Sequence, residues 1–428
     1  MSKTAPDHTH DADYWPRLAD SQLESALKGS GAVQIVGPKW CGKTATAEQR
    51  SASQVFLQNP DEGPSLLQLA DVRPSLILEG PKPRLIDEWQ MAPQLWDAVR
   101  FAVDQDKAKG QFILTGSATP KKRPKHSGVG RIARMRMNTM SLYESRESTG
   151  EVSIKELFDN TTDIACISDS TIEDLAFFIC RGGWPGAVVD PNKEIALMQA
   201  SNYVDELLDS DIDELDDKKR NATWLREIMR SYARNTSSEA SQSTIASDMH
   251  GEPPSENTVA DYLDALKRTY VTDDLEAWNP SLRSKTAVRT SPTRHFCDPS
   301  IAATLLGATP KSLLMDFETF GLLFESLCVR DLRIYANALK GNVYHYRDKS
   351  GLEADAVIVL NDGRWAAIEV KLGERAVEEG AKHLLKLANK VDCAKMGEPS
   401  FLMVVTGQQA AYRREDGVMV APLTTLAP

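Results

Sequence analysis

The segment Gly37-Pro38-Lys39-Trp40-Cys41-Gly42-Lys43-Thr44 sets the architecture that we expect of this chain. It matches the pattern G-x-x-x-x-G-K-[ST] of a phosphate-binding loop at every fixed position. The apolar run 32–36 before it predicts a β-strand, and residues 44–49 after it can begin a helix. Glycines in such a loop let main-chain N–H groups turn toward phosphates, and the helix adds the positive end of its dipole. The segment therefore predicts a nucleotide-binding α/β domain.

The polar positions of this loop have distinct expected partners on a bound triphosphate. Lys43 would neutralise phosphate charge, and the hydroxyl of Thr44 would be a ligand of Mg²⁺. The expected cofactors are ATP and Mg²⁺, with contacts along the whole loop. GTP is not expected, although Asn389-Lys390-Val391-Asp392 matches the guanine-reading pattern N-K-x-D. That motif lies far along the chain in a helix-like stretch, whereas a GTPase needs it at a strand end of the same sheet.

The second half of the site is expected at Leu85-Ile86-Asp87-Glu88, where a short apolar strand ends in two acids. Asp87 would hold Mg²⁺ through water, and Glu88 would polarise the attacking water. The alternative is a solvated surface pair. A further apolar strand, 111–114, ends in hydroxyls at Thr115 and Ser117. Either hydroxyl could sense the γ-phosphate between the two half-sites; the alternative is an ordinary turn at a strand end.

A basic segment follows the strand that ends near Ser117. It contains seven Lys or Arg residues and no acid: Lys121, Lys122, Arg123, Lys125, Arg131, Arg134 and Arg136. We leave three interpretations open: a solvated loop, a nucleic-acid contact, or arginines that reach a phosphate in cis or from a neighbouring subunit. Arg131 is our candidate for such a catalytic arginine. The alternation in residues 136–142 predicts the last strand of the sheet.

Composition limits the class of protein. The chain has 428 residues with 41% hydrophobic and 26% charged residues, which are ordinary globular values and allow about two to four domains. The formal net charge of −11 argues against general coating of nucleic acid, but a local basic site is still compatible with it. Six scattered cysteines without a C-x-x-C pair, and no long apolar run, predict a cytoplasmic protein without disulfides or a membrane span.

The C-terminal part contains a second candidate site. Asp355 opens one predicted strand, and Glu369-Val370-Lys371, after thirteen intervening residues, closes the next, which is the spacing of PD-(D/E)XK nucleases without their Pro. On neighbouring strands Asp355 and Glu369 would point to one spot, with Lys371 on the same side as Glu369. Asp355 and Glu369 could hold a metal ion, Lys371 could steady water or phosphate, and Glu325 would add a carboxylate from a helix. The alternative is an ordinary strand pair with a salt bridge.

We expect five segments along the chain. These are a disordered leader (1–20), a P-loop ATPase domain (21–150), a helical segment (151–235), a winged-helix-like segment (236–310) and a nuclease-like domain (311–428). Residues 255–263 would form the second helix of a helix-turn-helix, but Glu256, Asp261 and Asp264 oppose DNA phosphates. Packing or a protein partner is therefore favoured there over base reading.

The motifs GPKWCGKT, LIDEWQ, FILTGSAT and GRIARMRMNTMSLYE together resemble a family of bacterial and archaeal AAA-type ATPases. The segment Arg181-Gly182-Gly183-Trp184-Pro185 resembles a GG-aromatic-Pro segment of the same proteins, so the likeness runs from about residue 20 to 420. The resemblance implies an AAA-type ATPase domain, a winged helix and a C-terminal nuclease-like domain of unknown function. It also makes homo-oligomerisation plausible.

The expected function is Mg²⁺-dependent ATP hydrolysis that controls a nuclease-like domain acting on or near nucleic acid, with DNA as the expected partner. The alternative is an ATP-switched regulatory protein that binds a partner without cutting DNA. A small-molecule kinase is a third interpretation, but the sequence shows neither a lid nor an acceptor site for it.

Overall fold

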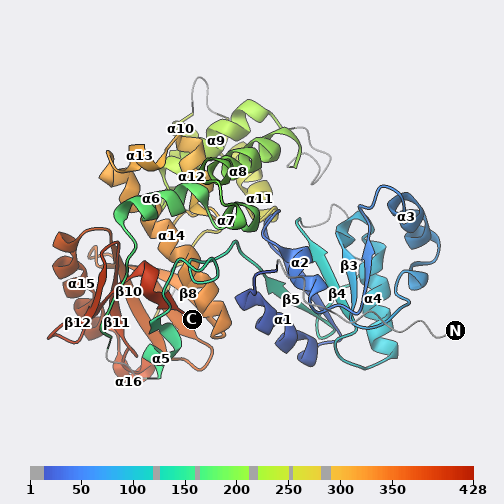
Figure 1. The fold of residues 1–428 in the computed structure, drawn as a ribbon, viewed down its shortest axis with the longest axis horizontal. Helices are drawn as coiled ribbons and strands as arrows, with labels where there is room; N and C mark the ends of the chain where they lie inside the picture. Colours follow the sequence, from blue (N-terminus) through green and yellow to red (C-terminus); the bar gives the residue numbers. More distant parts are fainter. Residues whose placement is uncertain (1–13, 119–125, 160–163, 212–219, 250–253, 281–290) are drawn as a thin grey trace. The chain divides into compact units, whose positions relative to one another are not determined.

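The structure is a computed structural model that describes residues 14–118, 126–159, 164–211, 220–249, 254–280 and 291–428 (Figure 1). The chain divides into two compact units, Met1–Met137 and Asn138–Pro428, called here the N-terminal unit and the C-terminal unit. Each unit has its own sheet and its own hydrophobic core.

The N-terminal unit is built on a five-stranded parallel sheet with strand order β2-β3-β4-β1-β5. Its strands are β1 (Ala32–Val36), β2 (Ser53–Phe56), β3 (Arg84–Asp87), β4 (Phe112–Gly116) and β5 (Ile132–Arg136). Its helices are α1 (Leu18–Gly29), α2 (Lys43–Glu48), α3 (Gly63–Val72) and α4 (Gln94–Gln105), with short turns η1 (Pro74–Leu76) and η2 (Trp89–Met91). Because β4 lies between β1 and β3, the predicted sensor strand separates the two nucleotide motifs.

Alternation along the strands produces a core on each face of this sheet. On one face Val33 and Ile35 of β1 pack with Leu23 and Leu27 of α1. On the other face the neighbouring β1 residue Ala32 packs with residues of α3 and α4. Helices therefore cover both faces, as expected for a parallel sheet whose strands are buried on both sides.

Two boundaries of the N-terminal unit differ from the prediction. The last strand is β5 (Ile132–Arg136) and not residues 136–142, because Asn138 and the residues after it pack within the C-terminal unit. The expected disordered leader is also too long. Residues 1–13 lie outside the described residues, but all of residues 14–20 except Pro16 are buried or half-buried, and α1 begins at Leu18.

The C-terminal unit contains a seven-stranded mixed sheet with order β7-β12-β13-β11-β10-β9-β8. The strands of this unit are β6 (Val152–Ser153), β7 (Cys166–Ile167), β8 (Gly341–Arg347), β9 (Glu353–Leu360), β10 (Trp365–Lys371), β11 (Leu402–Thr406), β12 (Ala410–Arg413), β13 (Met419–Pro422) and β14 (Leu426–Ala427). β10, β11 and β13 run parallel, whereas β9 is antiparallel to β10. Helix α15 packs on this sheet through Val377, Ala381 and Leu384.

The described helices of this unit are mostly in its first half. They are α5 (Ile154–Phe158), α6 (Ile172–Arg181), α7 (Pro185–Val189), α8 (Lys193–Glu206), α9 (Ala222–Arg234), α10 (Gln242–Ser247), α11 (Glu256–Arg268), α12 (Pro299–Leu306), α13 (Pro310–Leu313), α14 (Phe317–Ala338), α15 (Val377–Lys390) and α16 (Cys393–Met396), with turns η3 (Leu207–Asp211), η6 (Glu374–Ala376) and η7 (Leu423–Thr425). Residues expected to form one helical segment also supply strands, since β7 pairs with β12 and β6 pairs with β14.

A buried network of ion pairs and hydrogen bonds connects the first residues of this unit to α14. Arg330 of α14 is 4% exposed and pairs with Asp298 at 3.1 Å and with Asp331 at 2.8 Å. Asp298 also accepts hydrogen bonds from the hydroxyl of Thr139 and the main-chain N–H of Gly183. The GG-aromatic-Pro segment is thus held by charge as well as by the buried Trp184.

The segment that resembles a winged helix contains α10 and α11, followed by antiparallel bridges Thr272–Phe296 and Leu275–Thr293. Residues 250–253 and most of the expected wing, 281–290, lie outside the described residues. The winged helix therefore stays a prediction.

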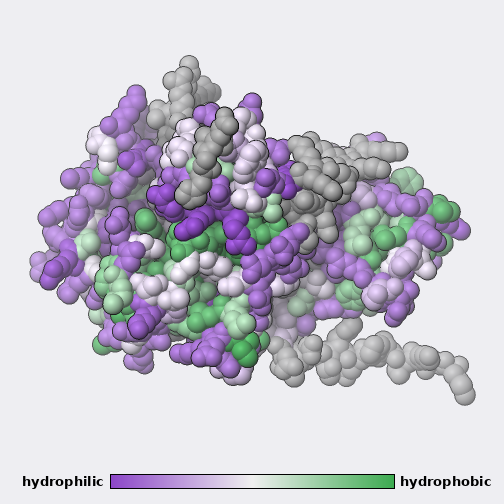
Figure 2. Space-filling view, turned by 90° about the horizontal axis from the view of Figure 1, so that it is seen from above, coloured by the Kyte–Doolittle hydropathy of each residue, from purple (hydrophilic) through white to green (hydrophobic). Residues whose placement is uncertain are grey.

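The molecular surface is largely hydrophilic on the face shown in Figure 2, where hydrophobic residues gather in separate patches. In the part of the chain that the structure describes, we find no helix with the length and apolarity needed to cross a membrane.

Candidate functional site

The phosphate-binding loop connects the carboxyl end of β1 with the first turn of α2. Gly42 caps α2 with φ of 97°, a left-handed conformation that favours glycine. A Cβ at Gly37 would overlap the carbonyl oxygen of Met137, so this position needs a residue without a side chain. Pro38 and Cys41 are buried, whereas Trp40 at the crown of the loop is 45% exposed and Lys39 is half-buried.

Lys43 lies over its own loop. Its side chain is 5% exposed, and Nζ donates hydrogen bonds to the carbonyl oxygens of Gly37 at 3.1 Å and Pro38 at 2.7 Å. The ammonium group is thus held where the loop curls, close to the main-chain groups that would receive phosphate oxygens. An anion bound there would offer it a stronger, charge-assisted partner than a carbonyl.

Three predicted residues from three elements meet at one carboxylate oxygen. Asp87 Oδ1 accepts hydrogen bonds from the hydroxyl of Thr44 at 2.7 Å and from the hydroxyl of Thr115 at 2.6 Å. Thr44 comes from α2, Asp87 ends β3 and Thr115 lies in β4. A hydroxyl beside a carboxylate is a donor set that suits Mg²⁺, so the residues present fit this ion.

Glu88 is also tied to the strand between the two motifs. Its main-chain N–H donates to Thr115 Oγ1 at 3.3 Å, and its carboxylate accepts from Ser117 Oγ at 3.3 Å and from the amide of Gln90. Glu88 has φ of 53°, which is uncommon for a residue with a side chain. Such strain is typical of positions that aim a side chain at a functional site.

The sequence analysis missed residues that brace the loop from the N-terminal side. Arg17 is 7% exposed, and its guanidinium donates to the carbonyl oxygen of Cys41 at 2.9 Å. The hydroxyl of Tyr14 lies 2.7 Å from Asp20 and 2.9 Å from Thr46 on α2. A Tyr and an Arg just ahead of an amphipathic helix were the available signal, but nothing in their spacing indicates contact with the loop.

The structure contradicts Arg131 as a catalytic arginine for its own loop. Residues 32–36 of β1 pair with 132–136 of β5, so Arg131 precedes the amino end of the strands whereas the loop follows their carboxyl end. The two ends are separated by roughly 15 Å. Arg131 instead pairs with Asp104 at 2.8 Å. Lys121, Lys122, Arg123 and Lys125 of the basic segment lie outside the described residues.

The second candidate site forms at the end of β10 in the C-terminal unit. Lys371 Nζ lies 2.6 Å from Glu369 Oε2 and 3.6 Å from Asp355 Oδ2. The main-chain N–H of Val370 donates to Asp355 at 2.7 Å. Pairing of β9 with β10 sets Ala356 opposite Ile368, which brings Asp355 next to Glu369 as the sequence predicts.

Burial changes the acidity of this carboxylate cluster. Desolvation and the nearby Asp355 raise the pKa of Glu369 to about 8. Burial and the charge of Asp355 also raise the pKa of Glu325, on the neighbouring helix α14, well above its ordinary value. Although desolvation opposes it, the carboxylates of Asp355 and Glu369 raise the pKa of Lys371. Negative charge on these carboxyl groups is therefore unfavourable, and a bound cation would favour their ionised forms.

The residues of this cluster are compatible with a metal ion, but they do not form a ready-made binding site for one. Glu369 Oε1 is buried and accepts no hydrogen bond from a described residue, and the imidazole Nδ1 of His383 lies 3.9 Å from it. Lys371, however, already neutralises both carboxylates. Over the described residues, no group of three or more His, Cys, Asp or Glu side chains is arranged to hold a metal ion.

The guanine-reading pattern is not part of the P-loop sheet. Asn389 and Lys390 end α15, and Val391 and Asp392 follow it in the C-terminal unit. The motif is therefore not at a strand end of the P-loop sheet.

Comparison with protein families gives three matches along the chain. Residues 30–145 match the AAA domain family AAA_14. Residues 172–312 and 320–426 match domains of unknown function, DUF8612 and DUF4143 respectively. The nuclease-like interpretation of the last part finds no support in these matches and stays a prediction.

Similar proteins include the uncharacterized proteins Rv2008c of Mycobacterium tuberculosis and Mb2031c of Mycobacterium bovis. Each is 26% identical over 358 residues, which are 83% of this chain and 73% of the relative. Among solved structures, the Walker-type ATPase PABY2304 of Pyrococcus abyssi has 14% identity and a TM-score of 0.42, covering 71% of this chain and 99% of that one. A variant of RuvB from Thermotoga maritima has 15% identity and a TM-score of 0.23, covering 63% of this chain and 92% of that one.

Likeness at these TM-scores carries no functional argument. The family match and the loop geometry do carry one, because the residues matched by the AAA domain family contain the phosphate-binding loop, β1, β3 and β4. The N-terminal unit is accordingly supported as a P-loop, AAA-type ATPase domain.

Proposed function

We propose that the N-terminal unit binds and hydrolyses ATP with Mg²⁺. The observation that carries this proposal is the meeting of Thr44, Thr115 and Asp87 at one oxygen, because it joins the phosphate loop to the strands of both other motifs. When bound, Mg²⁺ would neutralise developing charge on the phosphates. Thr44 and Asp87 would hold that ion.

The remaining residues have separate roles in this proposal. Lys43 would exchange the carbonyls of Gly37 and Pro38 for phosphate oxygens. Glu88 would orient the attacking water, with Gln90 and Ser117 holding its carboxylate. Thr115 touches both Asp87 and the main chain of Glu88, so it is placed to link the state of the phosphate to both acids.

The first test is phosphate release from ATP by the purified full chain with Mg²⁺. We expect Lys43→Ala to reduce the rate by about 10²–10³-fold, since a charge-stabilising group at the transferred phosphoryl is lost. Lys28→Ala is the matched control, because Lys28 is an exposed lysine of α1 that pairs with Glu24. Equal rates in the wild type and Lys43→Ala would refute the proposal.

For the C-terminal unit we propose metal-dependent cleavage of a nucleic-acid phosphodiester, controlled by the ATPase. Asp355 and Glu369 would hold the ion, Glu325 would add charge, and Lys371 would turn from the carboxylates to the scissile phosphate or the attacking water. The supporting observation is the buried Oε1 of Glu369, which no described hydrogen-bond donor satisfies.

A second candidate function is a regulatory protein that does not cut DNA. The observation that favours it is the ion pairing of Lys371 with both carboxylates, which balances the cluster without a metal ion. In this alternative, ATP binding and hydrolysis would switch the affinity of the C-terminal unit for a protein partner.

One assay separates these two candidates. Nicking of supercoiled plasmid with Mg²⁺ or Mn²⁺ and ATP should be lost in Glu369→Gln, which removes the charge but keeps the shape. Glu378→Gln is the matched control, because Glu378 is a solvent-exposed acid of α15. Intact plasmid under all conditions, together with nucleotide-dependent capture of a partner, would favour the regulatory alternative.

A further inference from the structure

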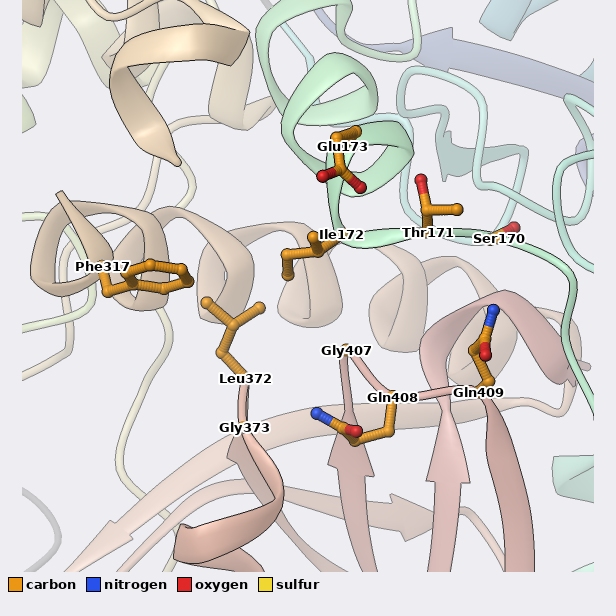
Figure 3. Close-up of a pocket in the computed structure, with 10 residues that line it drawn as sticks. All are labelled: Ser170, Thr171, Ile172, Glu173, Phe317, Leu372, Gly373, Gly407, Gln408 and Gln409. Atoms are coloured by element: carbon orange, nitrogen blue, oxygen red, sulfur yellow. The ribbon is translucent and has the colours of Figure 1, made fainter. Parts of the chain in front are cut away.

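A cavity of about 700 Å³ opens in the C-terminal unit (Figure 3). Its floor consists of residues that directly follow two paired strand ends, because Lys371 of β10 lies opposite Thr406 of β11 in the parallel register. Leu372 and Gly373 follow β10, and Gly407 follows β11. Crevices beyond the carboxyl ends of parallel strands are common ligand sites.

One end of this cavity is apolar. Figure 3 shows the side chains of Ile172, Leu372 and Phe317 gathered there from α6, the end of β10 and the start of α14. The ring of Phe317 is 60% exposed and lies against Phe320 with 6.2 Å between ring centres. An exposed aromatic ring beside aliphatic groups offers a flat surface on which a planar group can stack.

The other end is polar but not basic. The exposed side chains of Gln408 and Gln409 follow Gly407, and Ser170 lies across from Gln409 (Figure 3). Side-chain amides donate and accept hydrogen bonds at once, as the edges of nucleobases do. None of the described residues that line the cavity is Lys or Arg, and one is Glu173. The lining therefore disfavours an anion and suits a neutral, planar, polar group.

One cation adjoins the cavity wall directly in the sequence. Lys371 precedes Leu372 and Gly373, whereas the exposed acid Glu374 separates Gly373 from Arg375 in η6. A nucleic acid has a phosphate next to every base, so a base in the cavity would bring one phosphate toward Lys371. Stacking on aromatic rings beside backbone cations is a recurring way to bind single strands.

We propose that this cavity binds an unpaired nucleobase of a single-stranded nucleic acid whose neighbouring phosphate lies at the Asp355–Glu369–Lys371 cluster. The inference rests on the proposed phosphodiester site and specifies its substrate class. A base in a duplex is stacked and paired, so it cannot enter the cavity without leaving the helix. Single-stranded substrate, or a base turned out of a duplex, follows from the geometry.

The test is binding of fluorescently labelled oligonucleotides of DNA and of RNA to the full chain, measured by anisotropy without divalent ions. We expect single strands to bind more tightly than duplexes of the same sequence. Replacing the bases by abasic sites should weaken binding by about tenfold or more, because stacking is lost while phosphates remain. Equal affinity for abasic and base-bearing strands would overturn the proposal.

Three variants probe the cavity itself. Gly373→Phe should fill it, since a Cβ there meets no atom within 4 Å and φ is −114°. Phe317→Ala and the double variant Gln408→Ala/Gln409→Ala remove the stacking surface and the amides. Each should weaken single-strand binding by about tenfold without lowering the unfolding temperature. The control is Gln242→Ala, an exposed glutamine of α10.

The cavity and the cleavage proposals can fail separately. Plasmid nicking that depends on Glu369 but is insensitive to Gly373→Phe, with unchanged strand affinity, would overturn only the cavity proposal. Strand binding that is lost in Gly373→Phe, without cleavage under any condition, would support the cavity and refute the cleavage site. Tight binding of a peptide that the same variants abolish, with no oligonucleotide binding, would also overturn the proposal.

Discussion

The two units handle buried polar groups in opposite ways. In the N-terminal unit the site acid Asp87 is satisfied by the hydroxyls of Thr44 and Thr115, and Lys43 is satisfied by main-chain carbonyls. In the C-terminal unit full charges meet directly, at Lys371 with Glu369 and at Arg330 with Asp298. Neutral partners are easily exchanged for a ligand, whereas a buried ion pair resists separation. The neutral partners in the N-terminal unit suit a site that binds and releases its ligand in every catalytic cycle. The ion pairs in the C-terminal unit suit a rigid scaffold or a gated site.

The largest expected effect is that of a substitution at Glu88, in the unit whose buried polar groups have neutral partners. We expect Glu88→Gln to reduce ATP hydrolysis by about 10²–10⁴-fold, because the amide cannot take up the proton of the attacking water. Nucleotide affinity, measured with a fluorescent ATP analogue, should be unchanged. Glu79→Gln, an exposed acid of the same unit, is the control. Unaltered hydrolysis in Glu88→Gln would assign the water-orienting role to another group.

The second prediction concerns the buried ion pairs of Arg330 in the C-terminal unit. Replacing Arg330 by Met leaves Asp298 and Asp331 buried without their cation, which should cost about 3–5 kcal/mol of unfolding free energy. Urea unfolding followed by hydrogen exchange in the C-terminal unit measures this cost. Arg226→Met, at an exposed pair with Asp205, should cost at most about 1 kcal/mol. Equal losses in the two variants would show that burial of the network contributes nothing.

A smaller loss of unfolding free energy is expected when the pH is lowered, because of His345. Burial lowers the pKa of His345 to about 4, against the hydrogen bond to the carbonyl of Ser291 that raises it. The folded state thus prefers neutral His345, so its contribution is complete above about pH 6.5 and is lost as the pH falls toward 4. The shift corresponds to roughly 3 kcal/mol at most.

The measurement for His345 is unfolding free energy against pH for the wild type and His345→Gln. Glu239 and Arg347 also face this imidazole and remain in both proteins, as does the second buried histidine, His295. The variant should therefore show a shallower loss between pH 6.5 and 4 rather than none. Identical slopes would contradict the assignment.

The smallest effect is expected at Arg131, whose guanidinium is exposed and paired with Asp104. Arg131→Ala should leave ATP hydrolysis unchanged at low protein concentration and cost at most about 1 kcal/mol of stability. A loss of hydrolysis that grows with protein concentration would indicate that Arg131 acts on the site of a neighbouring subunit. A loss at every concentration would contradict its position ahead of the amino end of β5.

The sequence predicted features that depend on local chemistry. The phosphate loop, Asp87 and Thr115 follow from short motifs at strand ends, and the convergence of Asp355 and Glu369 follows from two adjacent strands. The sequence could not show that Arg131 lies at the opposite end of its strand from its own loop, because a motif does not give a residue's position along a sheet. The two-residue strands β6 and β7 were missed, since their pairing partners lie more than 240 residues away. Arg17 and Tyr14 act through packing that no local pattern indicates.

The pairing of Val152–Ser153 with Leu426–Ala427 has a consequence for synthesis of the protein. These strands, like β7 and β12, join the beginning of the C-terminal unit to its end. During translation, β6 and β7 have no strand partner until residues 410–427 have been synthesised. By then all strands of the P-loop sheet have long been available. Contacts of such long range form slowly. Translation should therefore yield an assembled nucleotide-binding half well before the other half can close.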